Sequence, residues 1–303
     1  MGSVSELGML INNLSSVEEM LSVSRKHAHM ASIFELVCGE VRLLRLLLEV
    51  QLALIRSQFL PSLLKLKEVC DRMRQWFNSI AYTKSKSKSS TSFFRFASST
   101  RNSSLQLCEW LEHFYWLLLS KFSLYFHDSL VMQCTSSDAE HTVNALKSPN
   151  FIHSFYNFHR KYDPTFIALI LNKTSSPDTA TTDIGYDIRM LNEVHKDGEL
   201  KNKFPILFRI GNDKNEFERL FPSISVLIQD VSDSNMSNDR IKYCYDIHLL
   251  RTFFVLLVEY NIYMVLVFSR KVAERDSAVV NFMLENGALL RCAKACQSLR
   301  GIK

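Results

Sequence analysis

The stretch RTFFVLLVEYNIYMVLVFS, residues 251–269, decides the fold class of this chain. Its centre, residues 252–268, is nearly all apolar, and a membrane-spanning helix is one interpretation of such a run. Glu259 and Asn261 lie in the middle, however, where a carboxylate facing lipid would cost about 2.5 kcal/mol or more. The β-branched and aromatic residues favour two central strands of a sheet, with Glu259-Tyr260 in the tight turn of a hairpin.

Further short apolar runs in the second half of the chain predict three more strands. They are rich in Ile, Leu, Val and Phe: FIALIL at 166–171, FPILFRI at 204–210 and SISVLIQDV at 223–231. Residues 237–249 indicate a helix, and an amphipathic pattern predicts a closing helix at about 273–299. We therefore expect residues 163–303 to form a small mixed α+β domain of about five strands with a C-terminal helix and a long polar loop at 172–203.

The first half of the chain has helical periodicity. Residues 33–57 indicate a long, mostly buried helix, and two apolar seams follow it, each stepping 3,4,3,4,3 along one helical face. The seams are Leu63, Leu66, Cys70, Met73, Phe77 and Ile80, and then Cys108, Leu111, Tyr115, Leu118, Phe122 and Tyr125. They predict an antiparallel helical hairpin that packs on the helix before it.

The segments around these helices complete the domain organisation. Residues 83–104 are dominated by Ser, Thr and Lys and predict a flexible loop between the two seams. A further helix at 150–161 should end before Asp163-Pro164, because proline disfavours helix in the residue before it. The fold class is thus α+β, with a poorly patterned segment 1–32 and an N-terminal antiparallel helical bundle at 33–162 before the α+β domain.

Composition excludes several classes of protein. The chain of 303 residues has only 8 Gly and 6 Pro, which argues against a turn-rich β-sandwich. A net charge of +5 is too mild to predict a nucleic-acid partner. The 7 Cys are scattered and lack zinc spacing, so we expect buried, reduced thiols in a cytosolic protein. The N-terminus shows no signal peptide.

Motifs for catalysis are absent from the sequence. No phosphate-binding glycine loop, nucleophile elbow or His-Glu-x-x-His zinc motif occurs. His127-Asp128 is similar to the dyad of a metal phosphohydrolase, but such a site needs further ligands, and hydrogen bonding at a helix end also explains the pair. We therefore predict no catalytic, cofactor-binding or metal-binding residues.

Two segments are candidates for partner binding. Phe93, Phe94 and Phe96 form an aromatic cluster in the predicted loop, where exposed rings suit a partner anchor. The Lys-Ser repeat at 84–88 before them either attracts anionic lipid, RNA or a kinase, or is a solvated linker. Arg160, Lys161 and Asp163 end the predicted helix at 150–161, where they either complement the helix dipole or contact a partner.

Several words of the sequence, taken in order, resemble the KICSTOR subunit 2 family. They are FLPSL at 59–63, Trp76, LLLSKFSLYFHDSL at 117–130, RKYD at 160–163 and VFSRKVAERDS at 267–277. The resemblance covers residues 34–295, and the first 30 residues match nothing in it. Family members carry a further helical region before the matched part, so we expect an N-terminally short member. Arg275 and Asp276 lie in the last word and join the residues predicted to bind partners.

The resemblance implies a scaffold without enzymatic activity or cofactors. Such a subunit helps to tether the GATOR complex 1 to the lysosome and restrains the TOR kinase when amino acids or glucose are scarce. The implied partners are a kaptin-like protein, an integrin-α-like repeat protein, a large seizure-threshold-like protein and the GATOR complex 1. The implied location is the cytoplasm and the cytosolic face of the lysosomal membrane. A peripheral membrane-surface adaptor, or a metal-dependent hydrolase centred on His127 and Asp128, is the alternative.

Overall fold

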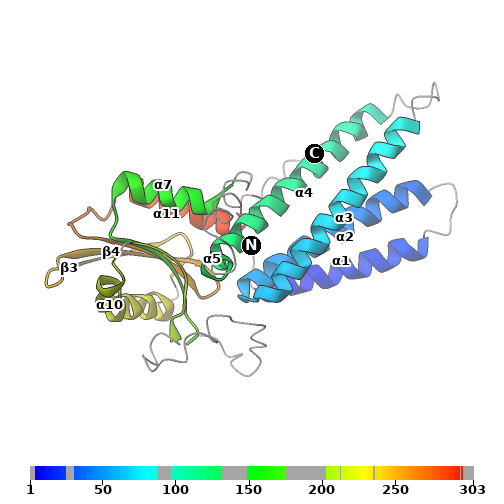
Figure 1. The fold of residues 1–303 in the computed structure, drawn as a ribbon. Coiled ribbons are helices and arrows are strands. Elements are labelled where there is room, and N and C mark those ends of the chain that lie inside the picture. The colour runs from blue at the N-terminus through cyan, green and yellow to red at the C-terminus, as the bar shows by residue number, and fades with distance from the viewer. Residues whose placement is uncertain are drawn as a thin grey trace. The chain divides into compact units, whose positions relative to one another are not determined.

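A computed structural model describes most of the chain, and two compact units account for it. The described residues are 4–24, 31–86, 97–131, 149–174, 203–211, 213–234, 236–293 and 295. The first unit comprises residues 1–119 with 295–303, and the second comprises residues 120–294 (Figure 1). The boundary between them falls within a helix, at residues 119 and 120, whereas the sequence places the domain boundary between residues 162 and 163.

The first unit is built from helices. They are α1 (Val4–Ser24), α2 (Ala31–Ile55), α3 (Phe59–Lys86) and the greater part of α4 (Ala97–Tyr125). No element was expected in residues 1–32, yet α1 occupies most of them and packs on α2. Helix α3 continues to Lys86 and α4 starts at Ala97, so the two helices take in both ends of the predicted loop 83–104.

The face of α3 that is buried differs slightly from the face that the apolar seam predicts. Leu66 and Met73 are buried as expected, but Leu63 is 40% exposed. The remaining buried positions of the stripe are Ser62, Val69 and Trp76. Trp76 packs so closely on α2 that a Cβ at Gly39 would lie 2.8 Å from the indole Cδ1. The contact with α2 therefore selects a face one residue away from the one that apolar periodicity picks out.

The second unit contains a fully antiparallel five-stranded sheet in the order β2-β1-β5-β4-β3. Its strands are β1 (Phe166–Leu171), β2 (Ile206–Ile210), β3 (Ile241–Asp246), β4 (Arg251–Glu259) and β5 (Ile262–Phe268). Residues 251–268 form the β4–β5 hairpin, and Asn261 in its turn has a φ of 58°. Within the described residues, no helix has the length and hydropathy to cross a membrane.

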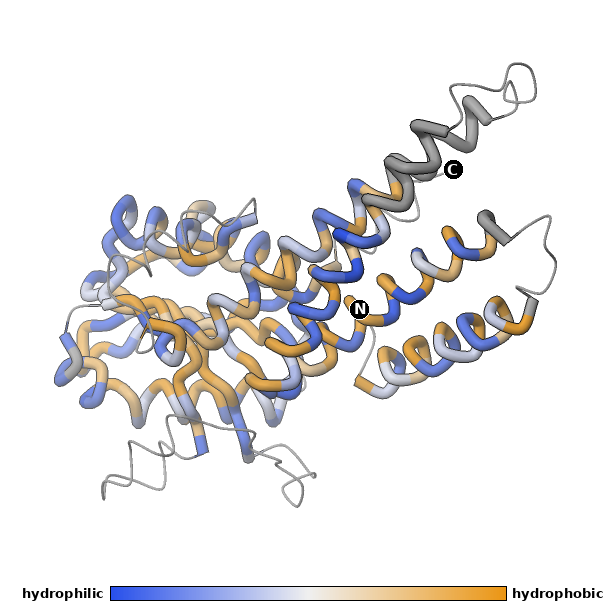
Figure 2. The backbone as a smooth tube through the Cα atoms, turned by 45° about the vertical axis from the view of Figure 1, so that its right-hand side comes forward, coloured by the Kyte–Doolittle hydropathy of each residue, from blue (hydrophilic) through white to orange (hydrophobic). Residues whose placement is uncertain are grey.

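Helices cover both faces of the sheet. Helix α10 (Lys214–Asp233) lies on one face, and α7 (Phe151–Tyr162) and α11 (Ser277–Leu290) lie on the other (Figure 1). Short α5 (His127–Val131) follows α4. Strands buried on both sides need apolar residues at every position. This explains the continuous runs in the sequence and the hydrophobic colouring along the strands in Figure 2.

Two predicted elements of this unit are wrong. Residues 223–231 belong to helix α10, not to a strand, because Phe217, Leu220, Ile224 and Ile228 continue one apolar helical face from the N-cap at Asp213. The predicted helix at 237–249 instead contains β3, an edge strand whose residues are all half-buried and which pairs with β4. One strand replaces the other, so five strands were expected and five are present.

The ends of two helices follow from their caps. Helix α7 ends where Asp163 takes a left-handed conformation and its amide donates to the carbonyl of His159 at 2.9 Å, as expected before Pro164. The expected closing helix at 273–299 is shorter, because the Asp276 carboxylate accepts hydrogen bonds from the amides of Ala278 and Val279 and starts α11 at Ser277. That helix ends at Leu290, before Cys292 with its φ of 56°.

Candidate functional site

A buried charged cluster joins three elements of the second unit. Lys121 and Tyr125 come from successive turns of α4, and Glu259 ends β4. The Lys121 Nζ lies 2.6 Å from Oε1 and 2.8 Å from Oε2 of Glu259, and the Tyr125 hydroxyl donates to Oε1 at 2.6 Å. Nζ also donates to the carbonyl of Leu290 at 2.9 Å, at the end of α11.

The charges of this cluster are buried and are satisfied by one another, so they stabilise one arrangement of the segments that carry them. Lys121 and Tyr125 are fully buried and Glu259 is 6% exposed, so their polar groups have exchanged water for one another. Burial raises the pKa of Tyr125 well above its ordinary value, and the Glu259 charge raises it further. The cluster therefore holds the last turn of α4, the end of β4 and the end of α11 together within the second unit. Sequence reasoning noted Glu259 but missed Lys121, a lone cation inside the apolar stretch LLLSKFSLYF.

One end of the sheet gathers the residues that the sequence predicted for partner binding. Helices α7 and α11 run antiparallel, because Phe158 stacks on Phe282 at 3.9 Å between ring centroids while Ser154, one turn earlier, donates to Asn286, one turn later. The end of α7 and the start of α11 therefore lie at the same end of this unit. The strand pairing places three connections at this end of the sheet. Here the last residues of β3 and β5 pair with the first residues of β4 and β1, as Asp246↔Arg251, Thr252↔Phe268 and Phe166↔Val267. The α7–β1, β3–β4 and β5–α11 connections therefore all emerge there.

Specific contacts tie these connections together. Arg270 Nη2 donates to the carbonyl of Tyr162 at 3.0 Å and joins the β5–α11 connection to the end of α7. The Thr252 hydroxyl donates to the carbonyl of Arg270 at 2.7 Å and accepts from the amide of Val272 at 3.1 Å. Lys271 Nζ lies 5.3 Å from the ring centroid of Tyr245 in β3. Two words of the sequence that are far apart in the chain, RKYD and VFSRKVAERDS, thus meet in space.

The β3–β4 turn adds an apolar apex at this end. Ile247 is 73% exposed, Leu250 58% and Leu249 36%. The Asp246 carboxylate accepts hydrogen bonds from the amides of His248 at 2.8 Å and Leu249 at 3.0 Å, which orders the turn. We call the whole region the sheet-end surface, which comprises Arg160, Lys161, Ile247, Leu249, Leu250, Arg270, Lys271 and Arg275.

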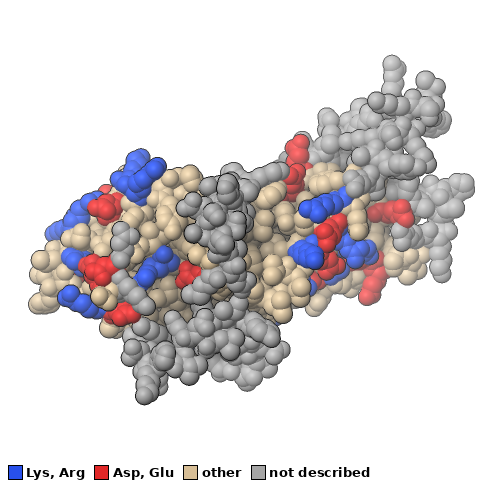
Figure 3. Space-filling model, in the orientation of Figure 1, with Lys and Arg blue, Asp and Glu red and all other residues tan. Residues whose placement is uncertain are grey.

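The structure brings together most of the predicted partner-binding residues. Arg160, Lys161, Asp163 and Arg275 are exposed at the sheet end, while Asp276 is half-buried there and caps α11. Figure 3 shows Lys and Arg side chains at this end, with Asp and Glu among them. Arg270 and Lys271 were missed, although they stand in a word that the resemblance singled out. Phe93, Phe94, Phe96 and positions 87–88 of the Lys-Ser repeat lie outside the described residues.

The hydrolase dyad is a local contact. His127 Nδ1 lies 3.3 Å from Oδ1 of the adjacent Asp128, and the His127 ring packs edge-on against Phe208 at 5.2 Å between centroids. Among the residues that the structure describes, no group of three or more His, Cys, Asp or Glu side chains could hold a metal ion. Cys292 is buried, and Cys38, Cys70, Cys108 and Cys244 are half-buried free thiols.

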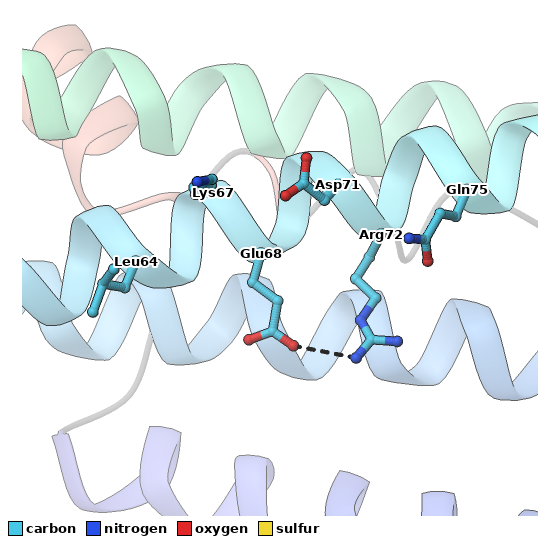
Figure 4. Close-up of a pocket in the computed structure, with 6 residues that line it drawn as sticks. All are labelled: Leu64, Lys67, Glu68, Asp71, Arg72 and Gln75. Carbon is cyan, nitrogen blue, oxygen red and sulfur yellow. Dashed lines mark ion pairs between the residues drawn. The ribbon is translucent and has the colours of Figure 1, made fainter.

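A hollow in the surface of the first unit is made by a single helix. Its lining residues all come from α3, and Figure 4 shows Glu68 and Arg72 directed toward each other, 3.5 Å apart. The other lining residues are Leu64, Lys67, Asp71 and Gln75. Such a row of side chains one turn apart on an exposed helix face explains the hollow without a ligand.

Comparison with known proteins gives a consistent match over nearly the whole chain. A family model described as KICSTOR complex C12orf66 like matches residues 4–302. KICSTOR subunit 2 of Xenopus laevis is 26% identical over 261 residues, which cover 86% of this chain and 56% of that protein. KICSTOR subunit 2 of Danio rerio is 25% identical over 291 residues, which cover 96% of this chain and 63% of that protein.

Two facts follow from these matches. The chain spans less than two thirds of the length of either relative. The family model includes most of the first 30 residues, so the expectation that this segment matches nothing in the family is wrong. Helix α1, which packs on α2, is the part of the fold that corresponds to it.

Proposed function

We propose, because this chain belongs to the KICSTOR complex C12orf66 like family, that it is a non-enzymatic scaffold subunit of a KICSTOR-like complex. The observation that carries the proposal is the family match, which runs from residue 4 to residue 302 and so includes both compact units. The relatives bear the name of a numbered subunit of that complex. A subunit of an assembly acts by presenting surfaces, and the folded units provide them.

The finer role follows the family resemblance. The assembly recruits the GATOR complex 1 to the lysosome and restrains TOR kinase signalling when amino acids or glucose are scarce. The partners are kaptin-like, integrin-α-like and large seizure-threshold-like subunits, together with the GATOR complex 1. The chain acts in the cytoplasm and at the cytosolic face of the lysosomal membrane.

Internal rigidity of the second unit supports a scaffold role. Its sheet is covered on both faces, and its buried charges, Lys121 and Glu259, bind each other with good geometry. A surface on such a unit is ordered before it meets a partner, which lowers the entropy lost on binding. Arg160, Lys161, Asp163, Arg275 and Asp276 are proposed to take part in binding, and the assembly role does not depend on them.

Affinity purification of the tagged full chain from its own cells, with mass spectrometry of the recovered proteins, tests the proposal. We expect kaptin-like and seizure-threshold-like proteins to be enriched over a tag-only sample. A Glu259→Ala chain serves as the control, because an uncompensated buried Lys121 should weaken the fold and reduce recovery. Absence of both proteins from a well-expressed wild-type chain that unfolds cooperatively in vitro would contradict the assembly role.

A further inference from the structure

The sheet-end surface combines an aliphatic apex with exposed cations that slightly outnumber the carboxylates around them. A single exposed aliphatic side chain is ordinary on a protein surface, but Ile247, Leu249 and Leu250 are exposed together in one turn. The turn is ordered by the Asp246 carboxylate. On its β4 side, Arg251 Nη2 lies 2.6 Å from Oε1 of Glu216 in α10, which anchors the base of the turn.

Three of the cations beside the apex make their contacts with uncharged groups. Arg270 donates a hydrogen bond to the carbonyl of Tyr162. Lys161 Nζ lies 5.1 Å from the ring centroid of Tyr162, and Lys271 Nζ lies over the ring of Tyr245. Carbonyls and aromatic rings carry no net charge, so these contacts orient the cations without neutralising them. Arg160 and Arg275 add two more exposed charges. Four carboxylates lie among the five cations, which leaves one positive charge in excess. They are Asp163 and Glu274, which are exposed, and Asp246 and Asp276, which accept hydrogen bonds from backbone amides.

We infer that the sheet-end surface docks on an anionic membrane surface. The apex enters the headgroup region, where aliphatic side chains are buried at the boundary with the acyl chains. The cations lie against lipid phosphates and carboxylates, and each Lys or Arg near such a surface strengthens binding about fivefold. A protein partner would need a hollow shaped to receive the projecting turn, whereas a lipid interface adapts around it. The inference goes beyond assembly and does not depend on it.

Flotation of the purified full chain with vesicles tests the inference directly. We expect the chain to float with phosphatidylcholine vesicles that contain phosphatidylserine, and to remain unbound with phosphatidylcholine alone. Raised salt should release it, because counterions screen the cations from the lipid charge. An Ile247→Trp chain should show a blue shift of tryptophan emission with the anionic vesicles, relative to wild type, if the apex enters the headgroup region.

Matched variants separate the two parts of the surface from general effects. Leu249→Asp with Leu250→Asp should weaken vesicle binding at least about tenfold, since it removes aliphatic area and adds repelling charge. The control is Val226→Asp on α10, where the side chain is 67% exposed away from this surface. Arg160→Glu should weaken binding more than Arg240→Glu, which makes the same change of charge before β3 at the opposite end of the sheet.

Two results would overturn the inference. One is a folded wild-type chain that does not float with anionic vesicles. The other is an apex variant that binds vesicles as well as the Val226→Asp control does. A chain that ignores vesicles but loses its co-purifying subunits on apex mutation would assign this surface to a protein instead. The assembly test reads co-purifying proteins and the vesicle test uses lipid alone, so each can fail without the other.

Discussion

Lys121 and Glu259, which lie 138 positions apart in the sequence, form a two-point ion pair in the interior of the second unit, with Nζ 2.6 and 2.8 Å from the two carboxylate oxygens. A charge pair taken out of water contributes less than its Coulomb energy suggests, but removal of one partner leaves the other buried and uncompensated. The effect of the pair on stability should therefore be largest in variants that remove only one of its two charges.

Glu259→Gln should lower the free energy of unfolding by about 3–5 kcal/mol, because it leaves the Lys121 ammonium buried without a counter-charge. Urea unfolding followed by circular dichroism measures the loss. The double change Lys121→Met with Glu259→Leu should cost less than Glu259→Gln alone. Glu216→Gln is the matched control, since its pair with Arg251 is partly exposed and should contribute about 0–1 kcal/mol. Equal effects at positions 259 and 216 would contradict this account.

Acid should loosen α1 from α2 through Glu18. Burial pushes the pKa of Glu18 up, but hydrogen bonds from Arg42 and Arg45 outweigh it, so the pKa lies below its ordinary value. A lowered folded pKa means that the stabilisation is present above about pH 4.5 and is lost as the pH falls through the folded value.

Hydrogen exchange of the α1 amides, corrected for intrinsic rates, measures this loosening. Wild type should lose protection in α1 below about pH 4.5. In Glu18→Gln the free energy of opening of the α1 amides should already be lower at neutral pH, by about 1 kcal/mol. Glu19→Gln, at the exposed neighbouring position, should leave protection unchanged. Protection in α1 that stays constant across this pH range would contradict a stabilising role for the ion pairs of Glu18 with Arg42 and Arg45.

Gly39→Ala should destabilise the first unit even though alanine is the better helix former. The new Cβ would lie 2.8 Å from Cδ1 and 3.1 Å from Nε1 of Trp76, and a buried indole has little room to move. Overpacking costs about 1–3 kcal/mol, which exceeds the helix propensity gain of roughly 1 kcal/mol. Thermal unfolding of Gly39→Ala, Trp76→Leu and the double variant tests this, because the smaller side chain should make room and the alanine should then be tolerated.

Asp276 can be tested for capping and for binding separately. Asp276→Ala should cost about 1 kcal/mol, because the amides of Ala278 and Val279 lose their acceptor. Asp276→Asn should recover most of that stability, since asparagine is an equally good N-cap, while it removes the charge. If both variants unfold like wild type, the cap contributes nothing; if Asp276→Asn keeps its stability but changes partner recovery, the carboxylate charge serves binding.

The sequence predicted the sheet best where burial leaves the clearest pattern. Strands β1, β2, β4 and β5 are covered on both faces, so their positions are apolar nearly throughout and their runs are visible in the sequence alone. The competing membrane helix at 252–268 was rejected on Glu259, and that carboxylate is indeed buried in a protein interior against Lys121. The ordered words of the sequence also gave the family, which the comparisons confirm.

Patterns that extend beyond a short window were misjudged. Residues 223–231 are rich in β-branched side chains, and only their continuity with Phe217 and Leu220 shows the helical face of α10. Strand β3 has polar and half-buried residues, and its structure comes from hydrogen bonding to β4 at the sheet edge rather than from its own pattern.

By itself, then, the sequence determined the fold class, four of the five strands, the end of α7 and the family, because local burial and caps leave a mark on neighbouring residues. Only the tertiary structure decided that Lys121 meets Glu259, and that Arg160 and Lys161 lie beside Arg270 and Lys271. Antiparallel strands bring alternate connections to the same end of a sheet whatever their separation along the chain, and no local pattern records which side chains will meet there.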